Sequence, residues 1–283
     1  MGDAPPKLCV GVTTYNHVRF IRQALESILS QKTSFPFEIV VHDDCSNDGT
    51  REIVEELVQA YPDKVRAILQ TENQFSQGRR IIQILLAEMR GEYFALLDGD
   101  DYWQSERKLQ TQADFLDRHP DCAMCQPKTV YYSETKRRAV LIFPPPNRRS
   151  GRFTCADLAE GNFIQTSAVM FRSAAVPVLP LEFGKLKFGD YPLFGLIAQS
   201  GWIGFIDEEM VTYRIHSGNF WLSKPTAERV EATTEVRRFL AEHIDPQYRQ
   251  AWVDALNTTQ RYPSRVVRGL WSRLREKAEL VLR

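Results

Sequence analysis

Alternation between short apolar runs and segments of helical periodicity most restricts what this chain can fold into. Four apolar runs have the length of buried strands, at 8–12, 37–41, 65–69 and 93–97. Between them, apolar residues repeat at helical spacing, around 20–29, 53–60 and 80–89. Such alternation implies right-handed crossovers and a mostly parallel sheet with its ligand site at the carboxyl ends of the strands. We therefore expect a Rossmann-like α/β fold whose polar loops meet at one edge of the sheet.

The fourth apolar run ends in an acidic cluster. Asp98, Asp100 and Asp101 place three carboxylates within four residues. Like charges this close resist full ionisation unless a cation offsets them. A solvated acidic turn is the structural alternative, but the apolar approach strand favours a site for a divalent metal and phosphate.

The composition suits one large domain with a sizeable core: the chain has 283 residues, of which 43% are hydrophobic and 25% charged. The 36 Lys and Arg residues balance the 36 Asp and Glu residues, so net charge gives no argument for a nucleic-acid partner. No apolar run approaches the roughly 20 residues that span a bilayer, and residues 1–6 lack the apolar core of a signal peptide. These features predict a cytoplasmic protein.

Five cysteines, an odd number, fit a reducing compartment without a disulfide framework. Cys122 and Cys125 have the spacing of half a zinc or redox motif. They fall in an expected strand at 122–132, where residues three apart point to opposite faces, and no second pair completes a metal site. We expect both cysteines to be structural.

Beyond the acidic cluster the alternation weakens. The three prolines at 144–146 predict a loop that separates a nucleotide-binding half from an acceptor half. Further expected elements are a helix at 108–117, a strand at 163–171, a helix at 191–199, two strands at 202–206 and 210–214 joined by a turn at Asp207 and Glu208, and helices from 226 onward.

The loop at 42–50 is rich in carboxylates and turn-forming residues. Asp48 and Gly49 predict a turn in which Asp48 or Thr50 caps the following helix. The spacing also matches a calcium-binding EF-hand loop. That interpretation requires an incoming helix, whereas residues 37–41 are typical of a strand.

Three segments together resemble the family 2 glycosyltransferases, which have the GT-A fold. They are Val-Thr-Thr-Tyr-Asn at 12–16, the acidic loop at 41–50 and Leu-Asp-Gly-Asp-Asp at 97–101. Each follows an expected strand, and the resemblance covers roughly residues 7–220. It implies a GT-A domain over 1–220, with a nucleotide-binding half at about 7–120 and an acceptor half at about 121–220. Residues 221–283 would form a helical C-terminal extension.

The resemblance assigns roles on the nucleotide side. It places Thr13, Tyr15 and Asp44 around the nucleotide base and Asp98 on the ribose side. It implies that Asp100 binds Mn²⁺ or Mg²⁺ against the donor's diphosphate, since hard cations take oxygen ligands and few protein carboxylates. Asp101, the next residue, would support this site.

Two further groups are candidates for the metal or the diphosphate. The segment at 213–219 resembles a family segment whose histidine reaches them, and His216 beside Arg214 in a glycine-containing loop suits phosphate better than a core. Arg80, with Arg79 before it, opens an expected helix and could contact the diphosphate through its charge. A solvated surface is the commoner place for such an arginine pair.

The acceptor half carries the expected base. The segment at 188–194 resembles the family's acidic motif, in which an aspartate deprotonates the acceptor hydroxyl. Gly189 replaces the motif's first acid and Asp190 is retained. Asp190 is also suited to cap the helix that follows, and the two roles are compatible. Gly161 resembles the fold's acceptor-side glycine loop, although an ordinary turn fits equally well.

Residues 261–283 contain seven Lys or Arg and two Glu, a local charge of +5, and their apolar residues line one helical face. This is the pattern of an interfacial helix on an anionic membrane. A helix that packs on its own domain, or on a second subunit of a homo-oligomer, is the alternative.

The resemblance therefore implies a metal-dependent, inverting glycosyltransferase that uses a nucleotide-sugar donor. Its acceptor would be a saccharide or lipid-linked molecule at the cytoplasmic membrane face, in cell-surface polysaccharide synthesis. A sugar-phosphate nucleotidyltransferase would need a glycine-rich phosphate loop, which residues 13–16 do not form. An aspartate-nucleophile phosphatase is excluded because Gly99 separates the acids and no threonine follows. A non-catalytic saccharide-binding module on the same fold stays open.

Overall fold

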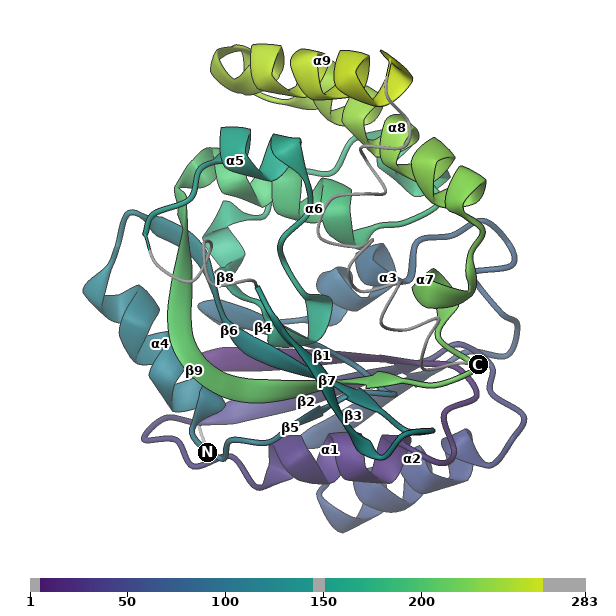
Figure 1. The fold of residues 1–283 in the computed structure, drawn as a ribbon. Coiled ribbons are helices and arrows are strands. Elements are labelled where there is room, and N and C mark those ends of the chain that lie inside the picture. The colour runs from purple at the N-terminus through teal and green to yellow at the C-terminus, as the bar shows by residue number, and fades with distance from the viewer. Residues whose placement is uncertain (1–5, 145–150, 262–283) are drawn as a thin grey trace.

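The computed structural model describes residues 6–144 and 151–261, which form a nine-stranded sheet with helices on both faces (Figure 1). The strands are β1 (Leu8–Thr14), β2 (Phe37–Asp43), β3 (Val65–Leu69), β4 (Tyr93–Asp98), β5 (Tyr102–Trp103), β6 (Cys122–Ser133), β7 (Arg138–Phe143), β8 (Met170–Arg172) and β9 (Trp202–Ile215). The helices are α1 (Ile21–Leu29), α2 (Thr50–Ala60), α3 (Ile81–Glu88), α4 (Lys108–Arg118), α5 (Cys155–Glu160), α6 (Asp190–Ile197), α7 (Phe220–Ser223), α8 (Thr226–His243) and α9 (Pro246–Arg261). The expected α/β fold is confirmed.

The first half of the sheet is parallel, as the alternation predicts. β3, β2, β1 and β4 are neighbours in that order, and each pairing is parallel. The register places Thr13 opposite Asp98 and Thr14 opposite Asp43. The loops that follow β1, β2 and β4 therefore meet at one edge of the sheet.

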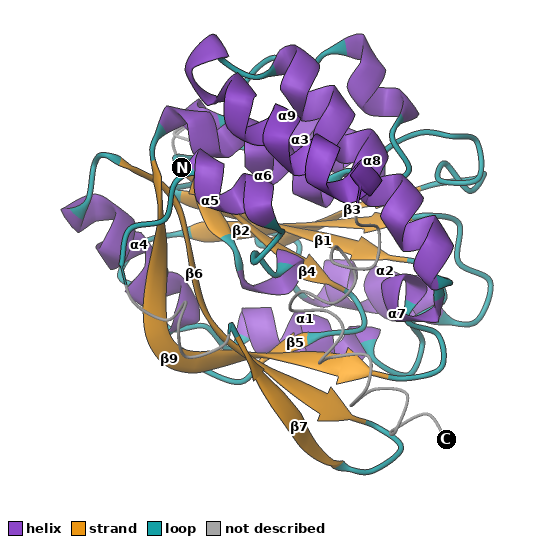
Figure 2. Cartoon of the chain, turned by 45° about the horizontal axis from the view of Figure 1, so that its top comes forward, coloured by secondary structure: helices purple, strands orange, loops and turns teal. Residues whose placement is uncertain are grey.

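The second half of the sheet is mixed. β8 is antiparallel to both β4 and β6, whereas the long, curved β9 is parallel to β6 (Figure 2). β5 pairs with β9, and β7 with β6, in antiparallel fashion. All nine strands thus belong to one sheet, and beyond β4 only the β6–β9 pairing is parallel.

Two predicted elements in this half are wrong. Trp202–Ile215 is one strand, not a pair. The register with β6 shifts where Lys128 faces Glu209, so the exposed Asp207 and Glu208 form an irregularity within the strand and not a turn between two strands. The strand expected at 163–171 is confined to β8. Before it, Thr166–Ala168 form a 3₁₀ turn, η2. The N–H of Gln165, just before this turn, donates to the side chain of Gln126 on β6 (3.0 Å) and not to a neighbouring strand backbone.

Two hydrophobic clusters cover the faces of the sheet. One contains buried residues of α1, α2 and α4, and the other contains residues of α3, α5, α6, α8 and α9. In Figure 1, α1 and α2 lie on one side of the strands and α5, α6 and α8 on the other, with α9 outermost. The sheet edge that carries the polar loops is left between these layers.

The C-terminal helices share the core of the acceptor half. Trp252 of α9 is fully buried, and a Cβ at Gly195 of α6 would lie 2.6 Å from Leu240 of α8. Arg237 of α8 donates hydrogen bonds to the carbonyls of Ala159 and Glu160 at the end of α5 (3.0 and 2.9 Å). The amphipathic stretch predicted at 261–283 lies outside the described residues apart from its first residue. No described helix is long and apolar enough to cross a membrane.

The cysteines are all free thiols. Cys122 and Cys125 are buried, and their Sγ atoms donate to the backbone carbonyls of Met124 and Gln112 (3.1 and 3.8 Å). Burial raises the pKa of both thiols, so neither is a ready metal ligand or nucleophile. The structural interpretation of this pair is confirmed.

Candidate active site

A cavity of about 1060 Å³ opens where the carboxyl ends of β1, β2 and β4 meet. Seven of the eight predicted site residues line it: Thr13, Tyr15, Asp44, Arg80, Asp98, Asp100 and Asp190. The eighth, His216, contacts Asp100 from the loop after β9. The fold therefore brings the acidic loops of the first half and the expected base of the second half to one cavity.

Asp98 is held at the cavity wall by the neighbouring strand. The hydroxyl of Thr13 donates to Asp98 Oδ1 (2.8 Å), and the N–H of Gly99 donates to the carbonyl of Thr13 (2.7 Å). A Cβ at position 99 would lie 2.8 Å from the hydroxyl of Thr14, which explains the glycine between the acids. Burial and the nearby charge of Asp100 raise the pKa of Asp98 to about 7. Thr13 thus positions Asp98 besides lining the cavity.

Asp100 faces two histidines. Its Oδ2 lies 3.1 Å from His216 Nε2 and 3.9 Å from His17 Nε2, and Asn219 Nδ2 lies 3.5 Å away. Burial opposes ionisation of Asp100, but the hydrogen bond from His216 and the charges of both histidines lower its pKa. The side chain is 13% exposed, so an ionised oxygen reaches the cavity.

The donor set fits a divalent cation with few protein ligands. No group of three or more His, Cys, Asp or Glu side chains in the described part of the chain forms a closed metal site. Asp100 alone suits Mn²⁺ or Mg²⁺ if phosphate and water complete the shell. The N–H of Gly218 donates to His216 Nδ1 (3.2 Å), so the proton of the neutral ring lies on Nε2 and points to Asp100. In this arrangement His216 supports Asp100, and its expected contact with the metal or the diphosphate stays a prediction.

Asp101 is a fully buried support for the loop. Its carboxylate accepts hydrogen bonds from the Ser167 hydroxyl (2.5 Å) and from the backbone N–H of Arg214 (2.9 Å). The Arg214 side chain, which the sequence suggested for phosphate, is 3% exposed. Its guanidinium donates to the carbonyl of Asp100 (2.6 Å) and pairs with Glu134 (3.2 Å). Arg214 therefore connects the acidic loop to β9, and its guanidinium is occupied by these partners.

Asp44 anchors the loop before α3. Its two carboxylate oxygens accept the backbone N–H groups of Gln74 (2.7 Å) and Phe75 (3.1 Å), and it is 4% exposed. Arg80 holds the opposite side of that loop: its guanidinium donates to the carbonyls of Gly184 (3.2 Å) and Lys187 (3.0 Å). Both side chains line the cavity, but these bonds occupy them in shaping it. Contacts of Asp44 with a base and of Arg80 with a diphosphate stay predictions.

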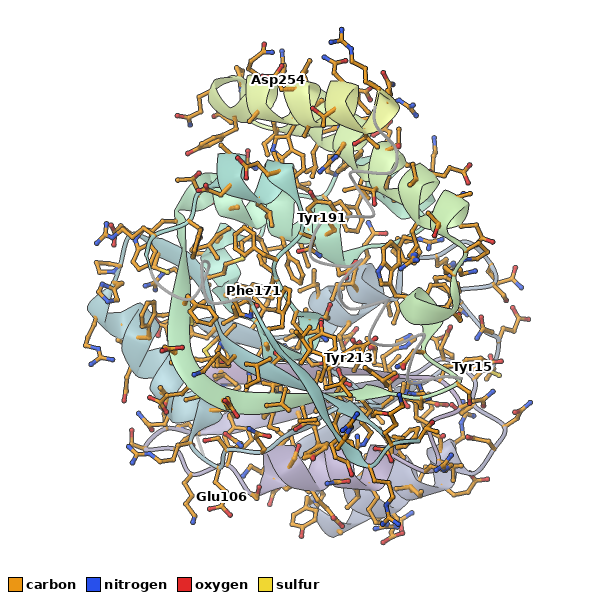
Figure 3. The ribbon with its side chains drawn as sticks, in the orientation of Figure 1. Tyr15, Glu106, Phe171, Tyr191, Tyr213 and Asp254 are labelled. Carbon is orange, nitrogen blue, oxygen red and sulfur yellow. The ribbon has the colours of Figure 1, made fainter. Side chains whose placement is uncertain are left out.

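Tyr15 is the exposed member of the set. Its side chain is 45% exposed at the wall of the cavity. Figure 3 shows Tyr15 near the edge of the molecule, with Tyr213 and Tyr191 nearer the centre. An open aromatic ring at this position is compatible with stacking on a planar ring.

Asp190 lines the cavity from α6, close enough to the acidic cluster for its charge to help raise the pKa of Asp98. It is the first residue of α6, and Gly189 occupies the N-cap position without a side-chain cap, so the predicted capping role of Asp190 is wrong. The hydroxyl of Thr166 donates to Asp190 Oδ2 (3.2 Å). Burial raises the pKa of Asp190, and hydrogen bonds from Tyr191 and Thr166 oppose this effect only in part. A partly desolvated carboxylate with a raised pKa is suited to accept a proton.

Sequence reasoning missed the residues that connect these groups. His17 follows the 12–16 segment directly, so its place in that loop was a usable signal. Thr166 and Ser167 carry no such signal. Both lie on η2, where Thr166 contacts Asp190 and the Ser167 hydroxyl contacts Asp101, so this turn joins the two sides of the cavity.

Comparison with known proteins identifies relatives of this chain. An uncharacterised protein of Mycobacterium tuberculosis is 35% identical over 218 residues, which are 76% of this chain and 61% of that protein. An uncharacterised glycosyltransferase of Nostoc sp. is 29% identical over 234 residues, 78% of this chain and 68% of the relative. The chain thus spans about three-fifths of the mycobacterial relative's length.

Solved structures share the fold at low sequence identity. TarS of Staphylococcus aureus in complex with UDP-GlcNAc superposes with a TM-score of 0.61 at 20% identity, covering 96% of this chain and 88% of that one. A mannosyltransferase of Pyrobaculum calidifontis in complex with GDP-Man and Mn²⁺ gives 0.62 at 17% identity, covering 99% and 82%. These structures confirm the GT-A architecture. Residues 9–176, more than half of the chain, match the family described as glycosyl transferase family 2, and the protein belongs to that family.

Proposed function

We propose that this protein is a metal-dependent, inverting glycosyltransferase that moves a sugar from a nucleoside diphosphate donor to an acceptor hydroxyl. The observation that carries the proposal is the shared cavity. Asp98 and Asp100 line it from β4 and the loop that follows, and Asp190 lines it from α6. Because the donor-binding carboxylates and the proposed base come from different elements around one cavity, a sugar and an attacking hydroxyl could be held between them.

The donor side would bind the nucleotide and its charged leaving group. Asp98 would accept hydrogen bonds from ribose hydroxyls, and Tyr15 would stack on the base. Asp100, oriented by His216, would hold Mn²⁺ or Mg²⁺. When bound, such a cation neutralises the negative charge that develops on the departing diphosphate. The GDP-Man and Mn²⁺ of the Pyrobaculum structure and the UDP-GlcNAc of TarS support this donor class.

The acceptor side would supply the base. Asp190 would take the proton of the acceptor hydroxyl while that oxygen attacks the anomeric carbon from the face opposite the diphosphate. The C–O bond to the diphosphate breaks as the new glycosidic bond forms, so a single displacement inverts the configuration. Burial of Asp190 raises its pKa and makes it a stronger base than an exposed aspartate.

The relatives suggest a biological setting. A stretch of 117 residues is 36% identical to TarS, a poly(ribitol-phosphate) N-acetylglucosaminyltransferase, and 32% identical over 117 residues to a putative teichuronic acid biosynthesis glycosyltransferase of Bacillus subtilis. We infer a role in cell-surface polysaccharide synthesis, with a saccharide or lipid-linked acceptor at the cytoplasmic face of the membrane.

A donor screen tests the proposal. The full chain is incubated with UDP-, GDP- and dTDP-sugars in the presence of Mn²⁺, Mg²⁺ or EDTA, and thermal stabilisation and release of nucleoside diphosphate are measured. We expect one nucleotide class to stabilise the protein and to turn over only with a divalent cation. Stabilisation by a donor that EDTA does not affect would contradict the metal-dependent site.

A further inference from the structure

Four aromatic rings from three separate segments form a row along the cavity. Phe75 lies on the loop that Asp44 anchors, Phe188 just before α6, and Phe220 and Trp221 on α7. The ring centroids of Phe75 and Phe220 are 5.2 Å apart, those of Phe220 and Phe188 5.6 Å, and those of Phe188 and Trp221 4.7 Å. In Figure 1, α7 lies beside the sheet edge that carries the site, below the helical layer of α6 and α8.

The outer rings of this row are open to solvent. Phe220 is 47% exposed and Phe75 38% exposed. They are two of the few large hydrophobic side chains that are exposed in the described part of the chain, and both line the cavity. Although these two rings contact each other, each still exposes more than a third of its surface to water. Exposed aromatic surface inside a cavity indicates a ligand.

The row has a fixed position relative to the proposed base. Only Gly189 separates Phe188 from Asp190, and a Cβ at position 189 would lie 2.6 Å from Cγ2 of Ile82 on α3. This close packing prevents the short link from shifting toward α3. A ligand that contacts Phe188 therefore lies at the start of α6, where Asp190 lines the same cavity.

A polar group on the same wall lacks a partner. Gln165 is 6% exposed and lines the cavity, and its Nε2 has no hydrogen-bond partner among the described residues. Its Oε1 accepts the N–H of Thr166, the residue whose hydroxyl contacts Asp190. Buried amide donors are rarely left unpaired, and because Gln165 lines the cavity, a change of its side-chain rotamer would offer this donor to a ligand oxygen.

We propose that Phe188, Phe220 and Trp221, together with the amide of Gln165, form an acceptor subsite that binds a pyranose ring. A pyranose has a face of C–H groups, which pack on the electron-rich face of an aromatic ring, and hydroxyls at its edge, which accept from an amide. The subsite thus selects a sugar acceptor over a flexible polyol phosphate, which has no such face. This inference rests on the proposed function and adds the chemical class of the acceptor.

Saturation-transfer NMR tests the subsite independently of turnover. Methyl β-D-pyranosides and ribitol 5-phosphate serve as probes for the full chain with Mn²⁺-free buffer, to avoid paramagnetic broadening. We expect transfer to the ring C–H protons of at least one pyranoside, loss of this signal in Phe220→Ala, and partial recovery in Phe220→Leu. Tyr61→Ala, which removes a ring of similar exposure (46%) outside the cavity, should leave it unchanged.

Kinetics with the donor found in the screen provide the second readout. Phe220→Ala should raise the KM for the pyranoside acceptor about three- to tenfold, the range of one aromatic contact, with unchanged donor affinity. If Phe220→Ala weakens donor affinity as much as acceptor affinity, the ring belongs to the donor site and the inference is overturned. Preferential binding of ribitol 5-phosphate, or pyranoside binding that Phe220→Ala does not change, would also overturn it. If the pyranoside binds at the rings but no donor turns over, the proposed function fails and the subsite stands.

Discussion

Replacing Thr166 with valine tests how the structure sets the reactivity of the proposed base. The change removes the hydroxyl that donates to Asp190 Oδ2 at 3.2 Å and keeps the shape of the side chain. A hydrogen bond to a charged group contributes about 1.5–3 kcal/mol, and the long distance places this one at the lower end. Because about 1.4 kcal/mol corresponds to one pH unit, the pKa of Asp190 should rise by about one unit in Thr166→Val.

The sign of the effect follows from the role of the carboxylate. The hydroxyl stabilises the ionised form of Asp190, which is the form that accepts a proton. Without the hydroxyl, the acid limb of the kcat/KM profile against pH moves to higher pH, and activity at low pH falls most. Thr166→Ser retains the donor and should restore the wild-type profile. An acid limb that is the same in the valine variant and the wild type would refute the proposed coupling between Thr166 and the base.

Three further predictions concern packing, buried charge and the metal. Gly195→Ala should lower the free energy of unfolding in urea by about 1–3 kcal/mol, since its Cβ would meet Leu240 at 2.6 Å; an unchanged midpoint would contradict the close contact of α6 and α8. Lys108 is fully buried, its Nζ has no hydrogen-bond partner within the described residues, and burial lowers its pKa to about 7. Because the unfolded chain then binds more protons between about pH 7 and 10, wild-type stability rises with pH through that window. Lys108→Met should remove this slope and stabilise the protein most at pH 7; a gain that is equal at pH 7 and 9.5 would argue against the lowered pKa of Lys108. Asp100→Asn should abolish Mn²⁺-dependent donor binding in calorimetry, whereas His216→Ala should weaken it about 10- to 100-fold; equal effects of the two changes would make His216 a direct ligand.

The parallel half of the sheet could be predicted from the sequence alone. Its strands are mostly apolar, and helices of apolar periodicity follow β1 and β2, so local pattern and tertiary structure agree there. Because parallel strands end at one edge, the convergence of Asp44 and Asp98 followed from order along the chain alone. The resemblance then placed Asp190 in the same site, and its place in the cavity agrees.

Long-range contacts explain what could not be predicted. Asp207 and Glu208 have the sequence pattern of a turn. However, β9 stays paired with β6 on both sides of them, and they form an irregularity in one continuous strand. Gln165 lies in a segment that looks like a strand, but a side chain of β6 takes its N–H. Burial of Arg214 could not be predicted from the sequence because its partners, among them Glu134, lie on other elements. In each case a residue distant in sequence decides the local structure.

The central claim is that the acidic cluster binds the donor while Asp190 performs the proton transfer. The most direct test compares Asp190→Asn with the wild type in two measurements on the same samples: donor affinity by calorimetry with Mn²⁺, and turnover with donor and acceptor. We expect unchanged donor affinity and a fall in kcat of about 10²- to 10⁴-fold, the contribution of a general base. Full turnover in Asp190→Asn would contradict the claim.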